Sequence, residues 1–195
     1  MTVQSEGVDK PERYSSGGQI SGALGLAGVL AVALYGVVQP DAGYAPWFWA
    51  LLLLVAVLVH VVLLRPAVVL HAGEVELRNL LSSWWVPYGR LTGVEVKQMT
   101  KLHVSGEKYV GAGFGRSRAT IRRDGAIGAA PGEQPRDVEE KASLGHLVEA
   151  KLVRRMNGAK HAAAEAGPVR RTWAWPEVAA IAVLVVVTLV TALLS

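Results

Sequence analysis

The stretch RNLLSSWWVPYGRLTGVEV, residues 78–96, decides how the chain between its apolar ends folds. It contains two adjacent tryptophans, a Val-Pro-Tyr sequence, and then an alternation of apolar and polar residues that includes Val94 and Val96. Such alternation is typical of a β-strand with one buried face and one face in water. We therefore predict a water-soluble β-domain in the middle of the chain.

Outside this stretch, three long runs of residues carry no charge. These runs are residues 20–38, 47–64 and 178–194. Each has about the length that an α-helix needs to cross a hydrocarbon core roughly 30 Å thick. We therefore predict three transmembrane helices, at about residues 20–39, 47–64 and 176–194.

The positions of Lys and Arg predict the orientation of these helices. The loop of residues 40–46 has neither, and all 20 basic residues fall on the opposite side of the predicted spans. Basic residues that flank transmembrane helices are retained in the cytoplasm. We expect a multi-pass protein of the cell membrane, with its N-terminus and central domain cytoplasmic and its C-terminus external.

The first predicted span carries small residues at four-residue spacing, such as Gly18 with Gly22 and Ser21 with Gly25. Faces of small residues allow close helix contact in lipid, where packing drives association. The face can pack against the second span or against a second copy of the chain. The short loop between the first two spans favours packing within the chain.

The sequence divides into four parts. Residues 1–18 are polar and poor in apolar side chains, so we expect a disordered cytoplasmic tail. A transmembrane hairpin at 19–65, a cytoplasmic domain at 66–168 and the third membrane segment at 169–195 follow. About a hundred residues are enough for one small domain with its own core.

Most of the central domain reads as short strands. Val75 and Leu77 alternate with Glu74 and Glu76, and the run RATIRRDGAI at residues 118–127 is interpreted in the same way. Further on, a stripe of apolar residues repeats with the period of a helix, and Ser143 before it is the predicted N-cap. The stripe consists of Leu144, Leu147, Val148, Leu152 and Met156. An antiparallel sheet followed by one amphipathic helix is the expected core.

The order of these features resembles a known family. A transmembrane hairpin is followed by VVLHAGEVELRNLLSSWWVPYGRLTGVEV, by LHVSGEKYVGAGFGRSR, and by a helix that begins SLGHLVEAKL. This order resembles the bacterial PH-like domain proteins of the low-molecular-weight protein antigen family, common in actinobacteria. The residues that carry the resemblance are Arg78, Asn79, Val86, Pro87, Tyr88, Leu91 and Val94. Tyr88 stands where the family usually has tryptophan.

The resemblance covers roughly residues 67–160 and similar membrane flanks. It implies a bent antiparallel sheet of about seven strands, closed by a C-terminal helix. The expected fold class is thus membrane α plus α+β, with three transmembrane helices and a PH-like domain. The family supplies no catalytic residues, so the resemblance names a fold rather than a function.

The basic cluster GAGFGRSRATIRR, residues 111–123, is the sharpest candidate site. The glycines can expose backbone amides while the arginines bind phosphate, either on anionic lipid headgroups or on nucleic acid. The alternative is structural, with glycines that bend a strand and arginines that keep a strand edge solvated. The headgroup-binding candidates are Arg116, Arg118, Arg122 and Arg123.

Trp84 and Trp85 are candidates for contact with a partner or the membrane. Neighbouring residues of a strand point to opposite faces, so only one of the pair can be buried in a regular strand. The other interpretation is one core residue and one turn residue.

Several classes of function have no support in the sequence. The chain has no cysteine and 5 dispersed histidines, which gives no pattern for a metal site. No nucleophile elbow, catalytic triad order or nucleotide phosphate loop is present. We expect no enzyme activity, cofactor, nucleic-acid partner or small-molecule substrate.

Two hypotheses remain for the function. In the first, the cytoplasmic PH-like domain binds a protein or peptide partner, with secondary contact to anionic membrane lipids. In the second, the chain is a small accessory subunit of a membrane transport or envelope-building complex, and its spans carry the function.

Overall fold

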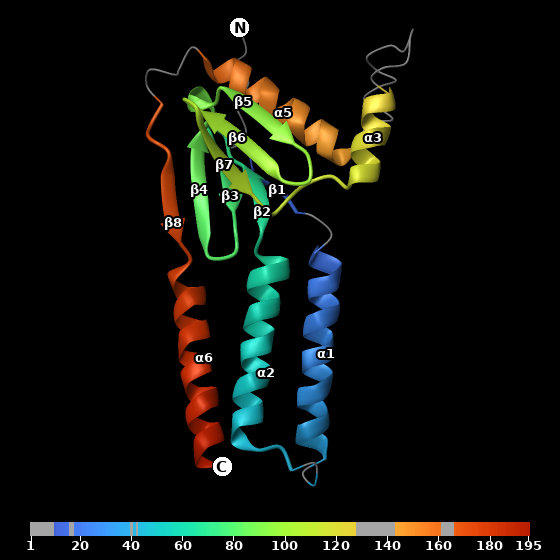
Figure 1. Cartoon of the computed structure of the whole chain (residues 1–195), viewed down its shortest axis with the longest axis vertical. Coiled ribbons are helices and arrows are strands. Elements are labelled where there is room, and N and C mark those ends of the chain that lie inside the picture. Colours follow the sequence, from blue (N-terminus) through green and yellow to red (C-terminus); the bar gives the residue numbers. More distant parts are fainter. Residues whose placement is uncertain (1–9, 16–17, 40, 42, 128–142, 161–165) are drawn as a thin grey trace, which may run out of the picture. The chain divides into compact units, whose positions relative to one another are not determined.

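Figure 1 shows the computed structural model of the chain. It describes residues 10–15, 18–39, 41, 43–127, 143–160 and 166–195, and for 123–127 the backbone alone. The chain forms two compact units. The first, which we call the domain unit, consists of the described residues of 1–16, Ala67–Asn79 and Ser83–Thr172. The second, which we call the helical unit, consists of the described residues of Gly17–Pro66, Leu80–Ser82 and Trp173–Ser195.

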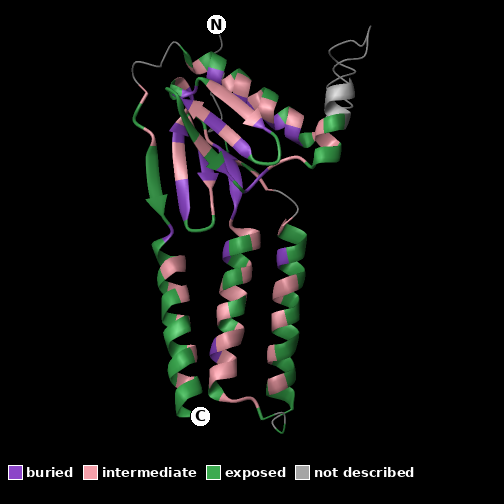
Figure 2. Cartoon of the chain, in the orientation of Figure 1, coloured by how far each residue is buried: buried purple, intermediate pink, exposed green. Residues whose placement is uncertain are grey.

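The helical unit contains three long helices. They are α1 (Gly18–Val38), α2 (Pro46–Val59), which continues as the π-helix η2 (His60–Leu64), and α6 (Trp175–Leu194). All three are long and apolar enough to cross a membrane. Most of their apolar side chains are exposed or half-buried, as Figure 2 shows, and α6 has no buried residue. The prediction of three apolar helices is confirmed, at nearly the predicted bounds.

Small residues of α1 face the end of α2, as predicted for packing within the chain. A Cβ atom at Gly22 would lie 2.6 Å from Leu64 Cδ2, and one at Gly25 would lie 3.3 Å from Val59 Cγ1. At the start of α6, Glu177 Oε1 lies 3.0 Å from Nε of Arg65, the residue after η2. This ion pair joins the end of α2 to the beginning of α6.

The domain unit holds two sheets, in which β1 to β4 and β5 to β7 pair antiparallel with their neighbours. The larger sheet has the order β1-β2-β3-β4-β8. Its strands are β1 (Glu12–Tyr14), β2 (Ala67–Leu70), β3 (Glu74–Arg78), β4 (Ser82–Pro87) and β8 (Arg170–Trp173). The smaller sheet is β5 (Gly93–Val96), β6 (Thr100–Val104) and β7 (Glu107–Gly111), with the 3-10 turn η3 (Tyr88–Arg90) between the sheets in sequence. The resemblance implied a single bent sheet, and the strands divide into two instead.

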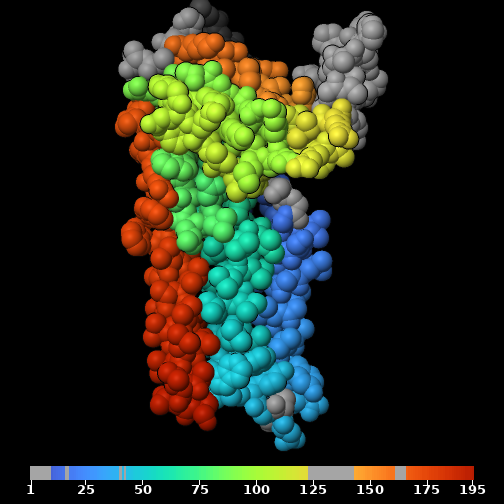
Figure 3. Space-filling view, in the orientation of Figure 1, coloured from blue at the N-terminus to red at the C-terminus, as the bar shows by residue number. Residues whose placement is uncertain are grey.

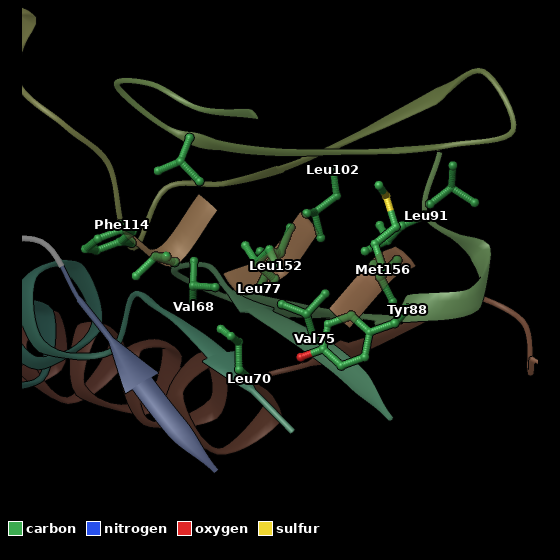
Figure 4. Packing of buried hydrophobic residues seen from close by; sticks show 14 residues of the cluster. Val68, Leu70, Val75, Leu77, Tyr88, Leu91, Leu102, Phe114, Leu152 and Met156 are labelled. Carbon is green, nitrogen blue, oxygen red and sulfur yellow. The ribbon is translucent and has the colours of Figure 1, made fainter. Parts of the chain in front are cut away.

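Helix α5 (Leu144–Ala159) covers these sheets and closes the core. Val148, Leu152 and Met156 are buried in one cluster with sheet residues such as Leu77, and Figure 4 shows Leu152 and Met156 within this cluster. The expected antiparallel sheet with a C-terminal helix is thereby confirmed. Two members of the predicted apolar stripe, Leu144 and Leu147, are exposed.

Two sequence predictions are wrong in part. Residues 12–14 were expected in a disordered tail, but they form β1 and pair with β2. Residues 118–127 were expected as a strand, but they form the helix α3 (Arg118–Ile127). Ser117 caps this helix, since its hydroxyl accepts a hydrogen bond from the backbone N–H of Thr120 at 3.1 Å. Residues 1–9 and 16–17 of the predicted tail lie outside the described residues.

Candidate functional site

The predicted basic cluster does not form one site. Arg116 is a structural residue, because its side chain is only 9% exposed and its Nη2 lies 2.5 Å from Glu149 Oε2 on α5. Its Nε also donates to the carbonyl oxygen of Val96 at 2.7 Å. Arg116 therefore joins α5 to β5, and its side chain is not exposed as contact with a headgroup would require.

The other three arginines belong to α3, which lies on the surface of the domain unit (Figure 3, yellow). Arg118 and Arg122 are exposed. The side chain of Arg123 lies outside the described part of the chain. Of the four predicted candidates, Arg118 and Arg122 thus remain able to contact a charged partner.

The glycines of the same segment serve close packing. A Cβ atom at Gly115 would lie 2.9 Å from the carbonyl oxygen of Lys97 and closer still to that of Gln98. A Cβ atom at Gly111 would lie 2.9 Å from Leu77 Cδ2. At these two positions the structural interpretation of the glycines is supported.

Trp84 lies against the core rather than in open solvent. It packs beside the hydrophobic cluster, with its ring 5.0 Å from that of Tyr109. Arg171 of β8 covers the ring, with its Cζ 5.1 Å from the ring centre.

Trp85 is also half-buried, on the opposite face of β4. Its ring lies 5.0 Å from that of His71, and its Nε1–H donates to Thr172 Oγ1 at 3.2 Å. Arg170 stacks over it at 5.8 Å. Each tryptophan is therefore shielded by an arginine of β8, and neither lies in a turn.

Asn79, one of the residues that carry the family resemblance, links the two sheets. Its Nδ2 donates to the carbonyl oxygen of Val110 at 3.0 Å, and its Oδ1 accepts from the backbone N–H of Ala112 at 2.9 Å. The side-chain amide of Asn79 therefore bonds the backbone at the end of β7, as a neighbouring strand would.

The domain unit contains an open cleft of about 950 Å³ that the sequence did not predict. Its walls are residues 71–74, residues 87–89, the last turn of α5, and residues 166–168 with Arg170. Arg155 of α5 donates to the carbonyl oxygen of His71 at 2.6 Å, and its Cζ lies 5.7 Å from the ring centre of Tyr88. These walls come from segments that are far apart in the sequence, so no local sequence pattern could have indicated the cleft.

Beside the cleft, the short strand β1 lies along β2. Lys151 of α5 donates to both carboxylate oxygens of Glu12, at 2.5 and 2.6 Å. This bond, together with one from Tyr14, holds the pKa of the Glu12 carboxyl below its usual value. Burial and the hydrogen bond to Glu12 raise the pKa of the Tyr14 hydroxyl to about 12.

The lowered pKa of Glu12 predicts how the docking of β1 depends on pH. A carboxyl whose pKa is lowered in the folded protein stabilises the folded state at pH values above its pKa in the unfolded chain, which is 4.5. This stabilisation is lost as the pH falls through the lower pKa of the folded protein. Hydrogen exchange, corrected for intrinsic rates, should show constant protection of the β1 amides from pH 7 to 5 and a loss below about 4.5. Glu12→Gln should remove this pH dependence. The same loss in that variant would contradict the assignment to Glu12.

Within the described residues, no group of three or more histidine, aspartate or glutamate side chains is placed to hold a metal ion. Comparison of the chain with protein-family models, curated proteins and solved structures finds no match. The candidate site is therefore defined by its own geometry, as a cleft in a small β-domain that is lined in part by the last turn of α5.

Proposed function

We propose that the chain is a multi-pass membrane protein that displays a cytoplasmic PH-like interaction domain, and that this domain binds a protein or peptide partner. The cleft of the domain unit carries the proposal. Its volume lies at the upper end of the range of about 300 to 1,000 Å³ that is usual for ligand sites. Apolar and polar groups both line it, which suits side chains of a peptide.

The order of elements supports the PH-like part of this proposal. Antiparallel strands β2 to β7 precede a helix, α5, that packs on them, over the same residues that carry the resemblance.

The pairing of β1 with β2 supports the predicted orientation of the chain in the membrane. It joins residues before the helical hairpin to residues after it, so both lie on one side of any membrane that α1 and α2 cross. The distribution of Lys and Arg supports a cytoplasmic position for that side.

Contact with anionic headgroups is a secondary part of the proposal. The segment 65–171 has a net charge of +7, and Arg118 and Arg122 are exposed on α3. Each basic residue near an anionic leaflet contributes roughly 1 kcal/mol of attraction. Because the apolar helices already attach the domain, this attraction would orient it rather than recruit it.

Filling the cleft tests the proposal. A Cβ atom at Gly158 meets no atom within 4 Å, so Gly158→Trp should place its ring in the cleft without disturbing the core. The neighbouring Asn157 is exposed and does not line the cleft, so Asn157→Trp is the matched control. After crosslinking of the full-length protein in its native membrane, Gly158→Trp should retrieve at least about tenfold less partner than the control.

A second arm exchanges α1, α2 and α6 for unrelated apolar helices. Partners should still be retrieved, because the domain carries the binding. Loss of every partner in this chimera, with normal retrieval by Gly158→Trp, would refute the proposal in favour of an accessory subunit whose spans carry the function.

A further inference from the structure

Strand β1 is an unusual component of the domain unit. It has only three residues, and the whole helical hairpin separates it in sequence from its neighbour β2. Glu12 lies opposite Leu70, Arg13 opposite Val69 and Tyr14 opposite Val68. The strand is thus a short peptide added to the edge of a sheet and held there in large part by its side chains.

Glu12 is held by two basic residues of α5. Lys151 contacts both its carboxylate oxygens, and Arg155 Nη2 lies 3.5 Å from Oε1. Residues four apart in a helix lie on one face, so α5 presents two cations side by side toward the edge of β2. This arrangement recognises a carboxylate at one position of an added strand.

Tyr14 follows Glu12 by two residues and therefore points to the same face of the strand. Its ring lies 5.9 Å from that of Phe114 and packs against the hydrophobic cluster. Its hydroxyl donates to Glu12 Oε2 at 2.5 Å. The groove between β2 and α5 thus has one place for a carboxylate and one for an aromatic ring, two residues apart.

The cleft begins beside the first residue of β1. Glu12 lies opposite Leu70, the last residue of β2, and the next residue, His71, is already part of the cleft wall. Arg155 contacts both places, since it reaches Glu12 on one side and the carbonyl oxygen of His71 on the other. Lys10 and Pro11, which precede Glu12, are exposed and do not line the cleft, so a partner strand that continues along β2 past its own glutamate meets a cleft that β1 leaves open.

The free energy of docking β1 on β2 is small enough for another peptide to replace it. Ordering a residue costs about 1 to 2 kcal/mol, and three residues have few bonds with which to offset this cost. β1 gains from its attachment to the chain, which gives an effective concentration in the millimolar range. A separate peptide needs additional contacts to compete, and the cleft offers them.

We propose that the groove between β2 and α5 binds an extended peptide of a partner protein with a glutamate two residues before an aromatic residue. This peptide adds to β2 in place of β1 and places the residues before its glutamate in the cleft. β1 is the intramolecular competitor. The inference rests on the proposed function and specifies the partner of the same cleft.

The test uses the full-length protein in detergent and a variant that lacks residues 1–15. The probe is a fluorescent peptide with the sequence of residues 4–15, QSEGVDKPERYS. The truncated protein should bind it at least about tenfold more tightly than the complete chain, because the competitor is gone. Peptides that carry Glu12→Lys or Tyr14→Ala should bind at least about tenfold more weakly. The Glu12→Lys peptide should recover affinity toward truncated Lys151→Glu.

Equal affinities of the original and Glu12→Lys peptides, or no binding to a truncated protein that retains its melting temperature, would overturn the inference. If the truncated protein does not fold, the complete chain with Glu12→Lys and Tyr14→Ala takes its place, and the same outcomes apply. Dimers that form only while β1 is present would also overturn it, in favour of strand exchange between two copies. Because partner retrieval by Gly158→Trp is measured independently, the proposed function can survive a failure here.

Discussion

Arg116→Ala is expected to destabilise the domain unit by about 2 to 3 kcal/mol. The substitution leaves the Glu149 carboxylate without its partner at 2.5 Å and the carbonyl oxygen of Val96 without its donor. Removing one member of a buried ion pair costs about 3 to 5 kcal/mol, and the 25% exposure of the Glu149 side chain reduces this figure. Helix α5 loses one of its attachments to β5 at the same time, while the hydrogen bond from the N–H of Val96 to Glu149 Oε1 remains.

Urea denaturation of the full-length protein in detergent, followed by tryptophan fluorescence, measures this effect. Arg118→Ala and Arg122→Ala are the controls, because both side chains are exposed on α3. Each should change the free energy of unfolding by less than about 0.5 kcal/mol. If Arg116→Ala were as mild as these two variants, the side chain would not serve as the structural link described above.

Gly115→Ala is expected to cost about 3 kcal/mol, although it adds a single methyl group. That methyl would lie 2.9 Å from the carbonyl oxygen of Lys97 and still closer to that of Gln98. Both are backbone atoms of the turn between β5 and β6, where the N–H of Lys97 donates to Met99 O at 3.2 Å and the N–H of Arg116 donates to Lys97 O at 2.5 Å. Overpacking usually costs about 1 to 3 kcal/mol, and a rigid backbone neighbour brings it to the upper end.

The matched control is Gly158→Ala, because a Cβ atom there meets open space on a helix. Alanine should leave the free energy of unfolding unchanged or raise it by up to about 1 kcal/mol through its helix propensity. The same denaturation experiment compares the two variants. Equal effects of both substitutions would contradict the close approach at Gly115.

The elements that could be predicted are those whose signal is local and long. The three apolar helices follow from uninterrupted apolar composition, and α5 follows from a helical repeat with a cap at Ser143, which the structure places 3.4 Å from the N–H of His146. The pattern at residues 118–127 was too short to predict a strand reliably, and a helix capped by Ser117 forms there.

The candidate site could not be predicted in the same way. Arg116 stands in the same run as Arg118 and Arg122, and nothing local to it distinguishes a buried arginine from an exposed one. The difference lies in Glu149, which is distant in sequence and reaches Arg116 only when α5 packs on β5. Glu12 likewise belongs to a polar segment with no visible strand pattern, and its partners Lys151 and Arg155 lie on α5.

The amino-acid sequence on its own determined the apolar helices, the strand-rich centre and the helix that closes it, because periodicity and composition act over neighbouring residues. Only the tertiary structure decided which charges are buried, that Glu12–Tyr14 is a strand, and that a cleft opens beside it. Those features depend on contacts between residues far apart in the chain. Such contacts form only when the separate elements pack together and exclude water from their charged groups.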